Sequence, residues 1–190
     1  IFYVPMVPIL IFFFKKDSLH WSVWPSVILC LTGGYLLTDF YDAIVRLGDA
    51  LVILGALFWS THIIFTGMIV KKYNLPLTIG AIQTFLVALF SFLIGLLYEE
   101  FVIENILNEI DSILYAGILS GGFAFVLQIY AQKNITPAPA AIIFSLEGVF
   151  ATIAAWFLLS QILGINNLIG CAFILSGVLL SQLVPLIKKS

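Results

Sequence analysis

The chain has 190 residues, of which 62% are hydrophobic and 9% are charged, and its formal net charge is −2. A soluble domain usually carries about 25% charged residues, so this chain has too few charges to cover the surface of a soluble globule. The composition excludes a disulfide-rich secreted scaffold and a disordered tail, and the net charge provides no basic field that would attract nucleic acid. A membrane protein with several transmembrane helices remains.

Charged residues divide the chain into seven apolar segments, six of which are long enough to span a bilayer. The segments are roughly 1–14, 20–38, 50–70, 75–98, 112–132, 137–159 and 165–186. The first would be roughly 21 Å long as a helix, which is shorter than the roughly 30 Å hydrocarbon core. Backbone groups in lipid must be paired within helices or closed barrels. Because the segments are too uniformly apolar for barrel strands, we expect an all-α bundle.

Polar residues and prolines mark where several of these helices begin. Asp and Ser side chains cap helix N-termini, and a proline in the first turn costs little because its missing N–H would be unpaired there anyway. The candidates are Asp17-Ser18, Asp49, Pro76, Asp111-Ser112, Pro137 and Pro139. Between the fourth and fifth segments, the apolar residues from Ile103 to Ile110 recur at helical spacing. They predict a short helix on the membrane surface, with a plain acidic loop as the alternative.

Lysine residues are concentrated on one side of the predicted membrane. The loops at 15–19, 71–74 and 133–136 and the tail 187–190 contain seven lysines and one acidic residue, Asp17. The loops on the other side are acidic, and their single basic residue is Arg46. Cytoplasmic loops are enriched in Lys and Arg. We therefore expect an integral protein of the cell membrane, the bacterial inner membrane, with a cytoplasmic C-terminus.

The first two segments resemble the last two when the chain is shifted by 143 residues. Phe14 then falls on Phe157 and Gly34 on Gly177, without a gap. This similarity of pattern predicts a five-helix unit from segment 50–70 onward, preceded by the end of an earlier copy whose beginning is missing. Because five is odd, successive copies enter the membrane in opposite orientations. Inverted repeats are typical of transporters that work by alternating access.

Glu147 is the one charged residue deep inside a predicted segment. A carboxylate at that depth is costly and usually faces a cavity or a partner. It is a candidate to bind a proton or a cationic group, and the alternative is a structural hydrogen bond to a neighbouring helix. His62 shares a helix face with Gly55, Trp59 and Thr66, which indicates either a cavity wall or a histidine satisfied by packing.

Glycines at helical spacing predict where helices pack closely or bend. Gly117 and Gly121 form a G-x-x-x-G motif that allows close approach of helices. The sequence Ser120-Gly121-Gly122 is expected to bend its helix at mid-depth, as in broken transporter helices. Gly170 and Gly177 predict a packing seam on the last helix.

Several stretches of the chain carry the motifs of a known family. They are Gly48-Asp49-Ala50-Leu51 with Gly55 to Trp59, Gly117 to Gly121 running into Gln128 to Lys133, Thr136 to Ala141, Ser145 to Ala151, and Gly170 to Leu180. Together they resemble the EamA family of the drug/metabolite transporter (DMT) superfamily, over 48–182 as one domain and over 1–38 as the tail of another. The family commonly has Glu-Pro where this chain has Glu147-Gly148, and often an aromatic residue at the position of His62.

This resemblance implies ten helices in two inverted five-helix repeats, with both termini cytoplasmic and transport of small metabolites, often export. We expect 1–38 to be the last two helices of a truncated first repeat, 39–48 an external linker, 49–186 the second repeat and 187–190 a cytoplasmic tail. The expected partners are the lipid bilayer, a small-molecule substrate and a proton or another coupling ion. No cofactor, metal or enzyme activity is expected.

The expected transport path is a cavity near the membrane midplane. The residues predicted to line it are Trp59, His62, Gln83, Ser120, Gln128 and Glu147. The residues predicted to pack or bend helices are Gly117, Gly121, Gly122, Gly148, Gly170 and Gly177.

Three alternatives to this transporter remain. A half-size transporter would act as a dimer. A seven-helix receptor fits the number of segments, although segment 165–186 lacks the Schiff-base lysine of a retinal protein. An intramembrane enzyme is the alternative that the sequence supports least, because the chain has neither a Gly-x-Ser-x-Gly nor a His-Glu-x-x-His motif.

Overall fold

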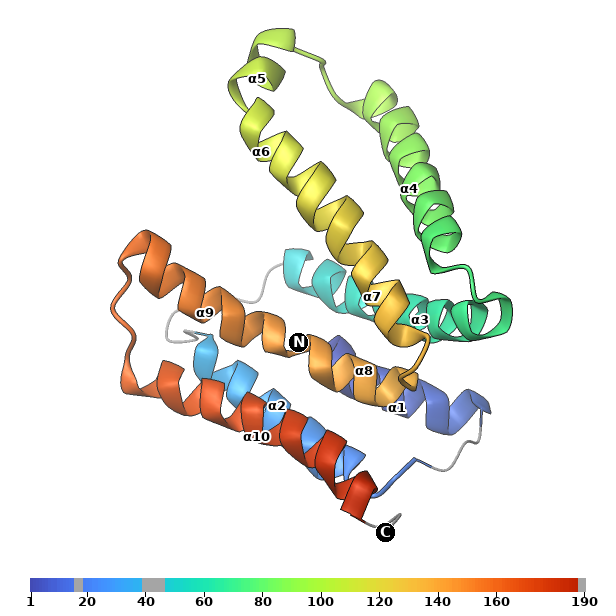
Figure 1. The fold of residues 1–190 in the computed structure, drawn as a ribbon. Helices are drawn as coiled ribbons and strands as arrows, with labels where there is room; N and C mark the ends of the chain where they lie inside the picture. The colour runs from blue at the N-terminus through green and yellow to red at the C-terminus, as the bar shows by residue number, and fades with distance from the viewer. Residues whose placement is uncertain (16–18, 39–46, 188–190) are drawn as a thin grey trace. The chain divides into compact units, whose positions relative to one another are not determined.

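The computed structural model describes residues 1–15, 19–38 and 47–187, and every regular element within these ranges is a helix (Figure 1). In chain order the elements are α1 (Tyr3–Leu10), the π-helical η1 (Ile11–Lys15), α2 (Val23–Leu37), α3 (Leu47–Tyr73), α4 (Pro76–Tyr98), α5 (Ile103–Asn108), α6 (Ile110–Leu114), the π-helical η2 (Tyr115–Ala124), α7 (Phe125–Gln132), α8 (Pro137–Phe144), α9 (Leu146–Leu159) and α10 (Ile165–Ile187). The predicted all-α class is confirmed for this part of the chain. The predicted cap Asp17-Ser18, the linker positions 39–46 and the tail positions 188–190 lie outside the described residues.

Five helices in the described ranges are long and apolar enough to cross a membrane. They are Leu47–Tyr73, Pro76–Tyr98, Ile110–Gln132, Pro137–Leu159 and Ile165–Ile187. Each has 23 to 27 residues, roughly 34 to 40 Å at 1.5 Å per residue, which exceeds the hydrocarbon core of roughly 30 Å. As predicted, Pro76 and Pro137 stand at the first positions of their helices.

The second apolar segment forms a shorter helix than we predicted. α2 has 15 residues, roughly 22 Å, where the sequence pattern indicated a span over 20–38. The helix begins late because His20 and Ser22 form a turn ahead of it. The hydroxyl of Ser22 lies 2.8 Å from His20 Nδ1, and the Val23 amide donates to the His20 carbonyl at 3.0 Å. With the 12-residue helix Tyr3–Phe14, α2 is thus one of two shorter apolar helices.

The chain forms two compact units. The first consists of the described residues of 1–65 and 136–190, and the second of residues 66–135, so α3 is divided between them. The first unit contains the larger buried core, to which α1, α2, α8, α9 and α10 all contribute. Its fully buried side chains include Val4, Val7, Cys30, Ile142 and Ile174.

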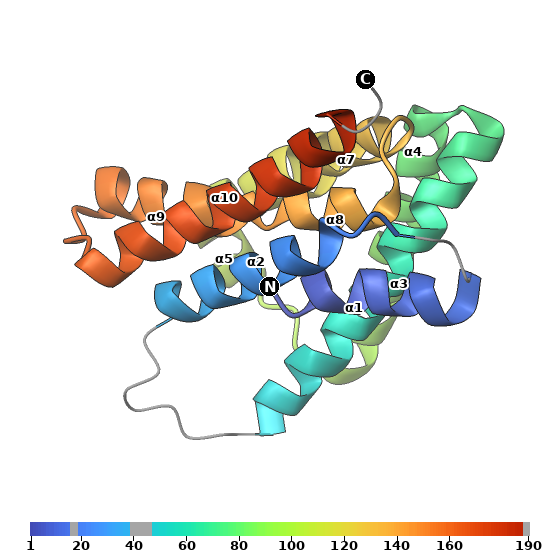
Figure 2. The same ribbon diagram turned by 90° about the horizontal axis from the view of Figure 1, so that it is seen from below.

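Within the first unit, α2 and α10 make the most extensive contact of any two elements, and they run side by side in both views (Figures 1 and 2). Glycines allow this approach. A Cβ atom on Gly170 would lie 2.8 Å from the Gly33 carbonyl oxygen, and one on Gly177 would lie 2.8 Å from both Cys30 Sγ and the Ser26 carbonyl oxygen. Gly170 and Gly177, for which we predicted a packing seam, therefore lie directly against α2.

In the second unit, α4 packs against η2 and α7. The contact passes over Gly80, where a Cβ atom would come within 3.0 Å of a methyl group of Val126. The 99–111 connector contains the six-residue helix α5, whose residues are all exposed. Its location on the membrane surface stays a prediction.

The helix around Ser120-Gly121-Gly122, where we predicted a bend, is π-helical over ten residues. A Cβ atom on Gly121 would lie 3.2 Å from the carbonyl oxygen of Ala116, five residues earlier. In contrast, a Cβ atom on Gly117 would meet no atom of the described residues within 4 Å. The proposed role of Gly117 in helix packing stays a prediction.

Candidate functional site

Glu147 lies next to an interruption in an otherwise continuous apolar helix. α8 ends at Phe144 and α9 begins at Leu146, so Glu147 occupies the first turn of α9. The interruption arises at Ser145, which is fully buried. Its hydroxyl donates to the Ile142 carbonyl at 2.6 Å, and its own carbonyl accepts the Gly148 amide at 3.2 Å. The Ser145 amide also donates to the Ile142 carbonyl at 3.2 Å. The two backbone bonds span three residues instead of four, so this turn is tighter than an α-helix.

The interruption forms without a proline, although the family that the chain resembles commonly has one directly after this glutamate. A serine hydroxyl competes with the backbone for carbonyl groups, which bends helices locally. Gly148 follows Glu147 and packs near α2 and α10: a Cβ atom there would lie 3.4 Å from Leu37 Cδ1 of α2 and 3.7 Å from Ile174 Cδ1 of α10. Serine thus supplies the break, and glycine leaves room for the neighbouring helices.

Tyr3 is the hydrogen-bond partner of Glu147. The tyrosine hydroxyl donates to Glu147 Oε1 at 3.1 Å, which joins α1 to α9. Tyr3 is 6% exposed, whereas Glu147 is exposed. The backbone of Tyr3 also makes a contact, because the Ser60 hydroxyl on α3 lies 3.4 Å from the Tyr3 carbonyl oxygen. One buried tyrosine therefore connects three helices of the first unit.

Two interactions reach the Glu147 carboxyl group. The N-terminal turn of a helix carries a partial positive charge, which stabilises an anion. A hydrogen bond to a charged acceptor contributes about 1.5–3 kcal/mol, roughly twice that of a neutral pair. Both effects act on Glu147 in α9. The arrangement therefore gives the carboxyl group a hydrogen-bond partner within an apolar helix, where an unpartnered charge would be costly.

A buried polar cluster lies behind the interruption. The Ser145 hydroxyl is 3.4 Å from Cys30 Sγ, and Cys30 Sγ is 4.0 Å from the Ile174 carbonyl oxygen. Cys30 and Ser145 have no exposed surface. This cluster connects the tight turn to α2 and α10, so the position of Glu147 depends on the seam between those helices.

Trp59 and His62 form a second feature of the first unit. Their rings stack on α3 with centroids 5.0 Å apart and an angle of 20° between the planes. Both residues are half-buried, while Ser60 and Ile63 between and beside them are buried. Residues three positions apart are neighbours on the surface of a helix, so the two rings can stack. It is compatible with either a cavity wall or simple packing.

The other predicted cavity residues belong to the second unit. Gln83 is half-buried on α4, Ser120 is exposed on η2, and Gln128 is half-buried on α7. The Gln128 Nε2 atom is buried and has no hydrogen-bond partner among the described residues. That these three residues line one cavity with Trp59, His62 and Glu147 stays a prediction.

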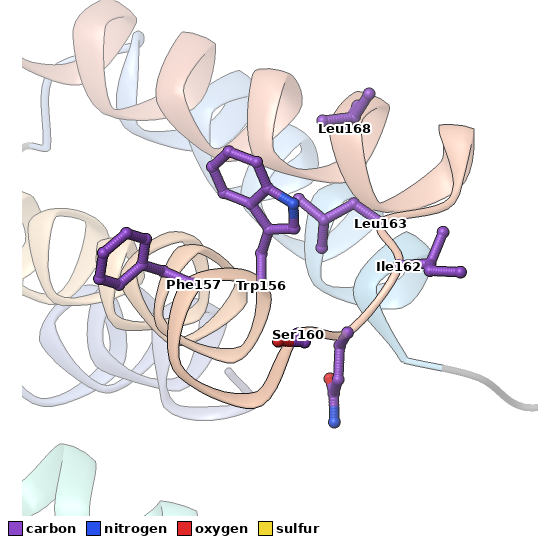
Figure 3. A pocket seen from close by; sticks show the side chains of 7 residues that line it. Trp156, Phe157, Ser160, Ile162, Leu163 and Leu168 are labelled. Carbon is purple, nitrogen blue, oxygen red and sulfur yellow. The ribbon is translucent and has the colours of Figure 1, made fainter.

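A hollow in the first unit lies elsewhere, at the loop between α9 and α10. It has a volume of about 720 Å³ and is open on one side. Its lining residues are Trp156, Phe157, Ser160, Gln161, Ile162, Leu163 and Leu168. Figure 3 shows the Trp156 ring directed from α9 towards Leu163, at the turn where Ser160 adopts a left-handed conformation. The hollow contains no charged group and none of the predicted site residues, so we do not assign it to the transport path.

Among the residues that the structure describes, no group of three or more His, Cys, Asp or Glu residues is placed to hold a metal ion. Sequence reasoning selected Glu147 but missed Tyr3, Ser145 and Cys30. A contact between residues 144 positions apart leaves no signal in one sequence.

Comparison with known proteins gives a family match over most of the chain. Residues 46–183 match the model of the EamA-like transporter family. A WAT1-related protein of Arabidopsis thaliana is 27% identical over 126 residues, which is 64% of this chain and 33% of that protein. A protein of Archaeoglobus fulgidus named as an uncharacterized transporter is 27% identical over 186 residues, 95% of this chain and 58% of that protein. The chain thus spans less than two thirds of either relative, and no solved structure matches it.

Proposed function

The chain belongs to the EamA-like transporter family, and on this premise we propose that it works as a secondary transporter of small metabolites by alternating access. The observation that carries the proposal is Glu147, a carboxylate at an interruption of an apolar helix, with a tyrosine as its donor. Transporter sites are commonly built at such discontinuous helices. The family match favours this function over a receptor or an enzyme.

The proposed architecture is a pair of inverted five-helix repeats. In it, residues 1–38 end the first repeat, 39–48 form an external linker, 49–186 form the second repeat and 187–190 a cytoplasmic tail. The helix bounds support this division. Adding 143 to the bounds of α2 gives 166–180, which falls inside α10, and adding 143 to 3–15 gives 146–158, which matches α9. The helices proposed as equivalent, α2 and α10, are also those that pack most extensively.

The proposed orientation has the C-terminus in the cytoplasm of a bacterial cell, with the protein in the inner membrane. It rests on lysines near helix ends, such as Lys71 and Lys72 in the last turn of α3. The opposite loop, which contains α5, is acidic. The proposed direction of transport is export, driven by a proton or another coupling ion. A half-size transporter that acts as a dimer is the variant to compare with it.

The test is transport by the purified protein in proteoliposomes. The probes are radiolabelled cationic, zwitterionic and anionic metabolites, assayed with and without an imposed pH gradient. We expect uptake of one charge class, and we expect Glu147→Gln to lower its initial rate about tenfold, the effect of losing about 1.4 kcal/mol of transition-state stabilisation. Glu104→Gln, which removes an exposed carboxylate of α5, is the matched control and should leave the rate unchanged.

The folded yield separates a transport role from a structural one. If Glu147→Gln lowers yield and rate equally, the carboxylate is structural and the proposed role is wrong. The size of the protein in detergent decides between a monomer and a dimer. Uptake that is absent for every charge class and every gradient would contradict the transporter itself.

A further inference from the structure

The hollow at the loop between α9 and α10 lies at the end of two helices that are long and apolar enough to cross a membrane, Pro137–Leu159 and Ile165–Ile187. Each has 23 residues, roughly 34 Å, so it is slightly longer than the roughly 30 Å hydrocarbon core. The last turn of one helix and the first turn of the other therefore reach the level of the lipid ester groups and headgroups. The hollow is lined from both of these turns and from the loop that joins them.

The lining combines an apolar wall with hydrogen-bond donors (Figure 3). The donors are the indole N–H of Trp156, the hydroxyl of Ser160 and the side-chain amide of Gln161, and all three residues are exposed. The ester carbonyl groups of a phospholipid are hydrogen-bond acceptors attached to apolar chains, so they match donors that lie beside an apolar wall. No lining residue is charged, so the hollow has no ionic partner for a charged headgroup.

Ser160 stands at a position that usually belongs to glycine. α9 ends there in a left-handed conformation, with φ at 52°, and the Gln161 amide closes the turn by donating to the Ala155 carbonyl at 3.2 Å. Glycine is preferred at such a helix end because a Cβ atom is unfavourable in this conformation. A serine therefore destabilises the turn but adds a hydroxyl at the edge of the hollow. Such strained residues concentrate at ligand sites.

The size of the hollow fits one part of a lipid. Its volume is about 720 Å³, within the range of roughly 300–1,000 Å³ that is common for small-molecule sites. We propose that it binds the glycerol-ester region of a membrane phospholipid, whose acyl chains leave through the open side into the bilayer. The side chain of Ile162 in the same loop is 95% exposed, and so much apolar surface is more stable against lipid than against water. The lipid site does not depend on the proposed transport.

The experiment measures lipid binding in the hollow of the purified chain in detergent. The probe is a phosphatidylcholine with a diazirine near the ester group of one acyl chain. On illumination the diazirine loses dinitrogen, and the resulting carbene inserts into a nearby C–H or O–H bond. Mass spectrometry of the peptides that cover 156–168 gives the labelled fraction. Competition by unlabelled dioleoylphosphatidylcholine, and by its dialkyl ether analogue without ester carbonyls, gives the affinity of each lipid.

We expect the ester lipid to bind about fivefold more tightly than the ether lipid, the factor that corresponds to one hydrogen bond. Trp156→Phe keeps an aromatic ring and removes the N–H, and Ser160→Gly removes the hydroxyl. Each should weaken binding of the ester lipid about fivefold and change binding of the ether lipid much less. Ser160→Gly should not lower the thermal midpoint, because glycine favours the left-handed conformation. Its weaker binding would therefore not result from unfolding.

The matched control is Trp21→Phe. Trp21 and Trp156 are both 56% exposed, but Trp21 does not line the hollow, so its replacement should leave both affinities unchanged. Equal affinities for the ester and ether lipids in the unmodified protein would overturn the proposal, as would an unchanged preference for the ester lipid in Trp156→Phe and Ser160→Gly.

The position of the label excludes the other occupants of the hollow. Absence of label from 156–168 would overturn the proposal, and a cross-link from this peptide to a second copy of the chain would assign the hollow to a dimer instead. Label that is displaced by a charged metabolite and not by the ester lipid would make the hollow part of the transport path. Because binding is measured without transport, the lipid site and the transporter can fail separately in these assays.

Discussion

Gly33 and Gly170 face each other where α2 crosses α10, so closely that a Cβ atom on Gly33 would lie 2.5 Å from the carbonyl oxygen of Gly170. No real Cβ atom tolerates that distance to a backbone atom. Helices in lipid gain little from the hydrophobic effect, and their association depends on close packing between small residues. The contact therefore fixes the distance between α2 and α10, and with it the polar cluster that holds Ser145.

We expect Gly33→Ala and Gly170→Ala each to destabilise the protein by about 1–3 kcal/mol, the usual cost of forcing an extra methyl group into a packed interface. The measurement is the midpoint of thermal unfolding in detergent, followed by tryptophan fluorescence. Gly55→Ala is the control, because a Cβ atom there would meet nothing within 4 Å. It should be neutral or stabilising, since alanine favours a helix over glycine by about 0.5–1 kcal/mol. Equal effects at all three positions would show that backbone preference, and not the crossing, sets the result.

Ser145→Ala should change the position of Glu147 more than it changes the stability of the protein. The Ile142 carbonyl still accepts the backbone amide of residue 145, so the expected loss is within about 1 kcal/mol. Without the hydroxyl the turn can relax towards a regular α-helix and shift Glu147 away from Tyr3. We expect slower transport in the proteoliposome assay. Ser176→Ala removes a similar bond on α10, where the exposed Ser176 hydroxyl donates to the Ala172 carbonyl at 2.7 Å, and should leave the transport rate unchanged.

The long helices could be predicted because an apolar segment in lipid must pair its own backbone groups, which a helix does. Pro76 and Pro137 stand at the predicted helix starts. These starts could be predicted because the preference for proline in the first turn depends only on the local backbone. The shorter α2 was missed because the turn made by His20 and Ser22 depends on the orientation of a histidine ring, which hydropathy does not record.

The partner of Glu147 could not be predicted for a different reason. Glutamate in an apolar segment is conspicuous, but tyrosine is common near helix ends, where it needs no special role. Only the packing of α1 against α8 brings Tyr3 to Glu147. Likewise, Ser120-Gly121-Gly122 indicated a weak point in its helix, but the widened turns extend from Tyr115 to Ala124. The length of this π-helical stretch depends on backbone hydrogen bonds, which glycine allows but does not specify.

His62 has two interpretations that one substitution separates. His62→Phe keeps a ring against Trp59, so a packing role predicts no change in the unfolding midpoint and none in transport. A cavity wall predicts the same midpoint but an altered Michaelis constant, because the imidazole nitrogens are lost from the path. We expect the second result. His62→Ala should lower stability by about 0.5–1.5 kcal/mol through loss of the stacked pair, as aromatic pairs of this kind contribute.

The lysine asymmetry predicts that Lys72 and Glu104 lie on opposite sides of the membrane. Lys72 is in the last turn of α3, and Glu104 is in the first turn of α5, on either side of the 23-residue helix α4. We expect a membrane-impermeant maleimide to label Glu104→Cys in intact cells and Lys72→Cys only in inverted vesicles. Both variants are made in a Cys171→Ser background, and Cys30 needs no change because it is buried. Labelling of both cysteines from the same side would mean that α4 does not cross the membrane. If Lys72→Cys is labelled in intact cells and Glu104→Cys only in inverted vesicles, the proposed orientation is inverted and the acidic α5 lies in the cytoplasm.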